Sequence, residues 1–208
     1  REVFLLRWHR GKLEREELPP LPDGCAFHAA AMLDEMLYVA GGQEAPDAPA
    51  LRTFWTLSLT RRGASWRHEE AWPGPARILP VLVAQAGSLY LAGGCALHRG
   101  PDGKPTREYL KDAYRYTPGS GWTRIEDAPR ALTAAPALAS GRSEVRIFGG
   151  DDGEHAQRIQ ELKDRHPGFC KDILVLDIRT HRWRREGTLP VGLVTTSAVR
   201  WGSRVVIP

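Results

Sequence analysis

The 208-residue chain is 42% hydrophobic and 26% charged, a composition that permits a packed core and argues against wholesale disorder. Its net charge of +4 comes from arginines scattered among acidic residues rather than gathered in a stripe, so we expect no nucleic-acid binding. No run approaches the ~18 apolar residues that a membrane span requires, and none is expected. Cys25, Cys95 and Cys170 lie far apart without metal-ligand spacing, which predicts buried free thiols and no metal, with a single disulfide left open.

The chain begins with two strand-like runs, at residues 3–8 and 12–17. Together they align with the last two strands of the units that follow, and Leu13 stands where those units have tryptophan. The first 22 residues are therefore predicted to form half of a repeat unit.

Three similar units come next along the chain. In each, an apolar strand ends in a Gly-Gly pair, and the second glycines, at 42, 94 and 150, are 52 and 56 residues apart. A polar loop of variable length follows, and then a second strand-like run, at 54–59, 113–118 and 173–178. Each unit closes with a turn, a tryptophan and a loop that contains proline; the tryptophans are Trp66, Trp122 and Trp183.

These features are typical of the blades of a kelch-type β-propeller. The glycine pair lets the chain leave a strand sharply, because glycine adopts positive φ and has no Cβ. The tryptophan offers a large apolar face that packs between adjacent blades. We predict an all-β, partial kelch propeller over residues 1–208, with full blades at 23–75, 76–128 and 129–190 and half blades at 1–22 and 191–208.

This number of blades falls short of a complete ring. At roughly 55 residues per blade, a ring of about six blades needs on the order of 330 residues. An open arc exposes unpaired strand edges and the apolar faces between blades. We therefore expect the chain to be a fragment of a larger propeller, with closure by a homo-oligomer left open.

One side of the propeller is the expected place for a functional site. Neighbouring strands of a blade are antiparallel, so the loops after the second and fourth strands emerge on the same side, around the central axis. The most polar of these loops covers residues 151–172. Its first part carries three carboxylates and a histidine, namely Asp151, Asp152, Glu154 and His155.

Such a group is suited to general acid–base catalysis or to hydrogen bonds with sugar hydroxyls. Asp152 and Glu154 are the candidate catalytic residues, and Asp151 and His155 are candidates for substrate binding. The alternative is that Asp151 and Asp152 only end the strand and cap the following turn through local hydrogen bonds.

A short helical stretch is expected later in the same loop. Ile159 and Leu162 are three residues apart, as on one face of a helix, and Pro167 ends the pattern. We expect this helix to cap the pocket.

Two of the proline loops bring an arginine to the start of the next blade, Arg77 and Arg130. Near the axis, a guanidinium can hold a substrate carboxylate with two parallel hydrogen bonds. Both are therefore candidate substrate-binding residues. The alternative is a solvated arginine or a salt bridge between blades.

Residues 149–154 (GGDDGE), 166–169 (HPGF) and 171–208 resemble the N-acetylneuraminate epimerase, or sialic acid mutarotase, family, and in particular its cyclically permuted group. Before residue 149 the likeness is only to kelch repeats in general. The resemblance implies a six-bladed propeller that interconverts the α and β anomers of N-acetylneuraminic acid, without a metal or another cofactor. It also implies a periplasmic or secreted location.

The family's proposed glutamate–arginine pair is expected beyond Pro208. The resemblance therefore transfers less to this chain: Arg77 resembles the arginine of a Gly-Pro-Arg loop, although an alanine intervenes, and Asp152 lies in a shared loop. The expected function is a sugar mutarotase whose partner is a small sugar. The alternative is a kelch propeller that binds a protein or glycan without catalysis.

Overall fold

The computed structural model describes residues 2–100 and 105–208, which form strands joined by turns and loops. The strands are β1 (Val3–His9), β2 (Lys12–Leu18), β3 (Ala29–Leu33), β4 (Met36–Ala40), β5 (Phe54–Ser58), β6 (Arg67–His68), β7 (Val81–Gln85), β8 (Ser88–Ala92), β9 (Cys95–Arg99), β10 (Pro105–Tyr109), β11 (Ala113–Thr117), β12 (Gly121–Ile125), β13 (Ala137–Ser140), β14 (Glu144–Phe148), β15 (Asp172–Asp177), β16 (Arg182–Thr188), β17 (Val199–Trp201) and β18 (Arg204–Val206). Three short helical turns run consecutively, η1 (Ala156–Arg158), α1 (Ile159–Leu162) and η2 (Lys163–Arg165).

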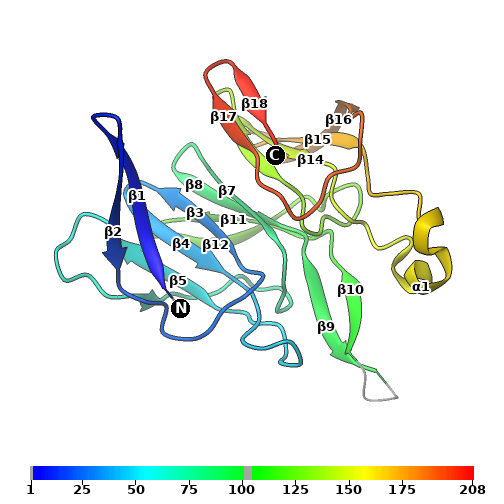
Figure 1. Ribbon diagram of the computed structural model, residues 1–208, viewed down its shortest axis with the longest axis horizontal. Helices are drawn as coiled ribbons and strands as arrows, with labels where there is room; N and C mark the ends of the chain where they lie inside the picture. The colour runs from blue at the N-terminus through cyan, green and yellow to red at the C-terminus, as the bar shows by residue number, and fades with distance from the viewer. Residues whose placement is uncertain (1, 101–104) are drawn as a thin grey trace.

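The strands form antiparallel sheets that are arranged as propeller blades (Figure 1). Three sheets have four strands, in the orders β3-β4-β5-β6, β7-β8-β11-β12 and β13-β14-β15-β16. The hairpins β1–β2 and β17–β18 form two-stranded sheets at the two ends of the arc. The predicted all-β, kelch-type propeller is confirmed.

One predicted loop has more structure than expected. The sequence predicts a polar loop after the second diglycine, but β9 and β10 pair there as an antiparallel hairpin that starts directly after the glycines, with Cys95 opposite Tyr109. The hairpin projects from the blades in Figure 1. The segment lacks the regular alternation of apolar and polar side chains that predicts a strand, so the sequence did not indicate this hairpin. The predicted helical stretch is confirmed as the η1–α1–η2 segment.

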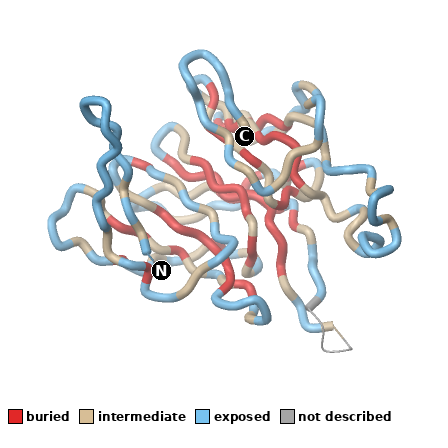
Figure 2. The backbone as a smooth tube through the Cα atoms, viewed as in Figure 1, coloured by how far each residue is buried: buried red, intermediate tan, exposed pale blue. Residues whose placement is uncertain are grey.

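The core lies between successive sheets. Phe54, Leu89 and Leu91 are fully or almost fully buried between the first and second four-stranded sheets. Val145 and Ile147 are buried in the next cluster, between the second and third. Burying a side chain of this size contributes about 1.5–3 kcal/mol. Figure 2 shows the buried residues in the middle sheets, whereas the end hairpins β1–β2 and β17–β18 are mostly exposed.

The repeated tryptophans join neighbouring blades, as the sequence predicted. In addition to its apolar contacts, each indole N–H donates a hydrogen bond to a backbone carbonyl at the end of the preceding blade. These bonds are Trp66 to Pro19 at 2.8 Å, Trp122 to Glu70 at 3.0 Å and Trp183 to Glu126 at 2.8 Å.

The diglycines also connect neighbouring blades. The second glycine of each pair donates its N–H to a carbonyl in the next proline loop, Arg77, Leu132 or Leu193. At the first position of the second pair, Gly93 has φ +61°, and a Cβ there would overlap the Leu132 carbonyl. Only glycine fits this combination of positive φ and close backbone approach.

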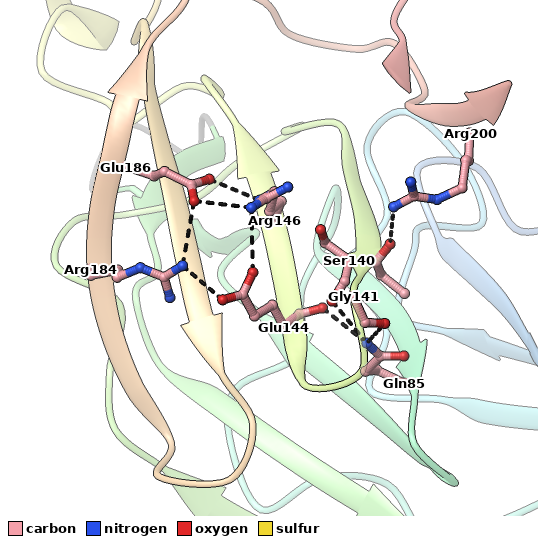
Figure 3. Close-up of polar contacts among 9 residues, drawn as sticks. Gln85, Ser140, Gly141, Glu144, Arg146, Arg184, Glu186 and Arg200 are labelled. Carbon is pink, nitrogen blue, oxygen red and sulfur yellow. Dashed lines mark hydrogen bonds and ion pairs between the residues drawn. The ribbon is translucent and has the colours of Figure 1, made fainter. Parts of the chain in front are cut away.

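A network of ion pairs lies on the face of the third four-stranded sheet that is turned away from the second (Figure 3). Arg146 on β14 and Arg184 on β16 lie on either side of Val175, and each contacts both Glu144 and Glu186. Val175 is fully buried although the side chains around it are charged. The aliphatic stems of the arginines therefore cover the sheet while their charged ends remain near solvent.

Candidate functional site

Arg77 lies in the interior of the blades. Its side chain has no exposed surface, and its guanidinium donates to both carboxylate oxygens of Asp112, at 2.8 and 2.7 Å. It also donates to the carbonyls of Gly93 and Pro75, at 2.7 and 3.2 Å. The guanidinium therefore makes four hydrogen bonds inside the protein, and this placement favours the alternative of a structural salt bridge over a substrate contact.

Arg130 repeats the same arrangement in the next blade. It binds the carboxylate of Asp172 through Nε and Nη2, and it donates to the carbonyl of Gly149 at 2.7 Å. Its side chain is 17% exposed, so this brace is less deeply buried than that of Arg77. Gly93 and Gly149 are both the first glycine of a diglycine, so the two arginines stabilise equivalent strand ends.

The sequence interpretation missed the two aspartates. Asp112 and Asp172 precede or open the third strand of their blades, and the carbonyl of each accepts the N–H of the first glycine. In the first full blade Thr53 has this position, and the Cys25 thiol contacts the Gly41 carbonyl at 3.2 Å in place of an arginine. The sequence signal for this brace was an aspartate that repeats at the start of the third strand in two successive blades.

Charge and burial oppose each other at Asp112. Burial, the largest influence, works to raise the pKa of its carboxyl group, but hydrogen bonds from Arg77 and from the Tyr114 hydroxyl outweigh it and lower the pKa. Burial, together with that hydrogen bond, raises the pKa of Tyr114 to about 12. Asp112 is therefore an ionised carboxylate that is paired with the Arg77 guanidinium and hydrogen-bonded by a neutral Tyr114, in an environment that contains little water.

The acidic loop, residues 151–155, holds its carboxylates by local hydrogen bonds. Oδ1 of Asp151 accepts the N–H of Gly153 at 2.9 Å, and Oδ1 of Asp152 accepts the N–H of Glu154 at 3.1 Å. The other oxygen of Asp152 accepts the thiol of Cys170 at 3.2 Å. The two aspartates thus make the local hydrogen bonds that the sequence analysis gave as the alternative to a catalytic or binding role.

Asp152 remains ionised in this loop. Burial acts to raise the pKa of its carboxyl group, but the hydrogen bonds from Glu154 and Cys170 and the nearby charge of Arg130 lower it overall. Conversely, burial and the bond to Asp152 raise the pKa of the Cys170 thiol to about 12. Cys170 is therefore a neutral thiol that holds a charged carboxylate.

The next two residues of the acidic loop are more open. Glu154 is exposed, and His155 is half-buried with its ring 5.5 Å from that of His166. The structure thus brings Asp151, Asp152, Glu154 and His155 together at one strand end. The helical turns after them contain no buried residue, and Ile159 is 49% exposed, so no observed packing supports the expected capping role of this segment.

The hairpin β9–β10 contributes a residue that the sequence did not single out. The ring of Tyr109 lies against Gly153 in the acidic loop, so that a Cβ at Gly153 would overlap it. Opposite Tyr109, Cys95 is fully buried, and burial raises the pKa of its thiol to about 11. All three cysteines are free thiols, although Cys25 and Cys170 are only half-buried.

Other candidate sites are less developed. A cavity of about 510 Å³ lies between the first two four-stranded sheets, lined in part by Arg52, Glu70 and Trp122, and none of the predicted site residues borders it. Within residues 2–100 and 105–208, no group of three or more His, Cys, Asp or Glu side chains is placed to hold a metal ion. In the same part of the chain, no helix has the length and apolar character needed to cross a membrane.

The family model described as N-acetylneuraminate epimerase matches residues 18–166, which is most of the chain. The expectation that residues before 149 resemble only kelch repeats in general was therefore wrong, because the family match covers the first two full blades as well. The chain belongs to the N-acetylneuraminate epimerase family. An N-acetylneuraminate epimerase of Brucella suis is 30% identical over 219 residues, with 90% of this chain and 53% of the relative covered. One from Haemophilus influenzae is 28% identical over 194 residues, with 83% and 49% covered. The chain thus spans about half the length of these curated family members.

A solved structure supports the fold of this family member. The protein described as "Structure of YjhT" superimposes with a TM-score of 0.72 at 18% identity, covering 91% of this chain and 59% of the other. At this level of identity the likeness establishes the propeller architecture and carries no information about individual site residues.

Proposed function

We propose that the intact protein interconverts the α and β anomers of N-acetylneuraminate or a closely related sugar. Membership of the N-acetylneuraminate epimerase family supports this substrate class. The observation that carries the chemistry is the acidic loop, in which an ionised Asp152 lies two residues from an exposed Glu154. The hydrogen bonds within the loop fix the backbone turn that carries these two residues before a substrate binds.

Anomer interconversion needs two proton transfers. A base takes the proton of the anomeric hydroxyl, the bond between the anomeric carbon and the ring oxygen breaks, and an acid protonates that oxygen. The ring then closes on the other face of the carbonyl, and both protons return. No net oxidation or reduction takes place.

Glu154 is the base in this proposal because its carboxylate is exposed, whereas both oxygens of Asp152 already accept hydrogen bonds. Asp152 contributes a fixed negative charge and holds the turn. His155, adjacent and half-buried, is the proposed proton donor. Arg77 has no part in substrate binding in this proposal, since its side chain is buried and its guanidinium is paired with Asp112.

The test is to follow α-N-acetylneuraminate, freshly released by a sialidase, by proton NMR with and without the intact protein. We expect the anomers to equilibrate faster than they do spontaneously, in proportion to protein concentration. An unchanged rate with a protein that circular dichroism shows to be folded would reject this substrate. Retained binding of the sugar without acceleration would instead identify a glycan-binding propeller.

A further inference from the structure

The hairpin β9–β10 is inserted between the second and third strands of its blade, and its base lies beside the acidic loop. Tyr109 is the last residue of β10 and is half-buried, whereas the side chains of Thr106, Arg107 and Glu108 before it are exposed. The Tyr109 side chain packs with the small cluster of Ala50, Ile78 and Cys95. Tyr109 is therefore held at the base of the hairpin, while the preceding residues of β10 are exposed to solvent.

The contact between Tyr109 and the acidic loop depends on a glycine. Gly153 has φ +82°, and the nearest atoms to a Cβ built there are Cγ, Cδ1 and Cδ2 of Tyr109. The tyrosine ring thus occupies the space that any side chain at residue 153 would need. The N–H of this same glycine is bound by Asp151, and the N–H of the next residue is bound by Asp152.

The charge of Asp151 also acts on the Tyr109 ring. Burial is the main cause that raises the pKa of Tyr109, and the charge of Asp151 adds to it. The charge of Asp151 also contributes to the raised pKa of the Cys95 thiol, directly across the hairpin. The base of the hairpin and the start of the acidic loop therefore form one packed unit, although about 40 residues separate them in sequence.

We infer that Tyr109 is a positioning residue for the acidic loop. Its ring lies against Gly153 and so sets the path of the backbone between Asp152 and Glu154, the two carboxylates of the proposed sugar site. This inference rests on the proposed function for its catalytic consequence, but the contact itself can be tested without activity. It assigns the inserted hairpin, which is absent from the two neighbouring full blades, a role in site geometry.

The first experiment uses glycine substitutions in the intact protein. Gly153→Ala places a Cβ against the Tyr109 ring, whereas Gly119→Ala is a matched control with a similar φ, +79°, and open space around it. We expect Gly153→Ala to lower kcat for anomer interconversion about 10- to 100-fold with little change in KM, because misplaced catalytic groups affect the reaction more than substrate binding. Gly119→Ala should leave kcat unchanged. Equal losses in the two variants would overturn the inference.

The second experiment changes the tyrosine. Tyr109→Phe keeps the ring and should retain kcat, whereas Tyr109→Leu removes the flat face and should lower kcat. Hydrogen exchange at the amides of Gly153 and Glu154 is the readout that does not depend on activity: exchange should accelerate in Tyr109→Leu and stay slow in Tyr109→Phe. If the intact protein has no mutarotase activity, the proposed function fails, and the exchange result alone decides the positioning role. Unchanged exchange in Tyr109→Leu would overturn it.

Discussion

The arginine–aspartate braces and the acidic loop both come from connections on the same side of the blades, yet they use their charges differently. Arg77 and Asp112 lie in the interior and neutralise each other through two parallel hydrogen bonds. In the acidic loop, Glu154 is exposed and the aspartates are held mainly by backbone N–H groups of their own turn. A buried charge must be paired, so it contributes to the fold, whereas a charge held by a local turn stays available to a ligand.

Removing one partner of the deeper brace should give the largest effect. Arg77→Ala leaves the Asp112 carboxylate buried without its cation, and we expect it to lower the free energy of unfolding by about 3–5 kcal/mol. Urea denaturation followed by circular dichroism measures this loss. Arg158→Ala breaks only the exposed pair with Glu161 and is the control, with no measurable change expected. Similar values for the two variants would remove the distinction between interior and exposed charges.

The corresponding change in the acidic loop should affect activity and not stability. Glu154→Gln removes the proposed base while it keeps the size of the side chain, and we expect kcat for anomer interconversion to fall about 100-fold. The unfolding midpoint in urea should not move, because the side chain is exposed. Retained activity in this variant would require another base.

Acid titration sharpens the comparison with a smaller effect. The pKa of Asp112 is lowered on folding from its ordinary value of 3.8, so the pair stabilises the protein fully above that value. The contribution is lost as the pH falls through the lower pKa of the folded state. The difference in unfolding free energy between the wild type and Asp112→Asn should therefore shrink as the pH falls below 3.8. A constant difference over this range would show that Asp112 is not the titrating group.

Local patterns in the sequence determined the architecture of this protein. The Gly-Gly strand ends and the spaced tryptophans predict antiparallel blades, because alternation, positive φ and large apolar faces act within one blade or between neighbours. The sequence also shows that the acidic residues of 151–155 lie together, since they are adjacent along the chain. Whether they act on a sugar stays a prediction.

Only the tertiary structure decided which charged residues are available. Arg77 and Arg130 looked like candidates for substrate binding, but each meets an aspartate 35 or 42 residues away, and the carbonyl of a diglycine completes its environment. Tyr109 meets Gly153 through an inserted hairpin that the sequence presented as a loop. Such contacts join residues that share no local period, so they arise only when the blades pack and determine which polar groups lose contact with water.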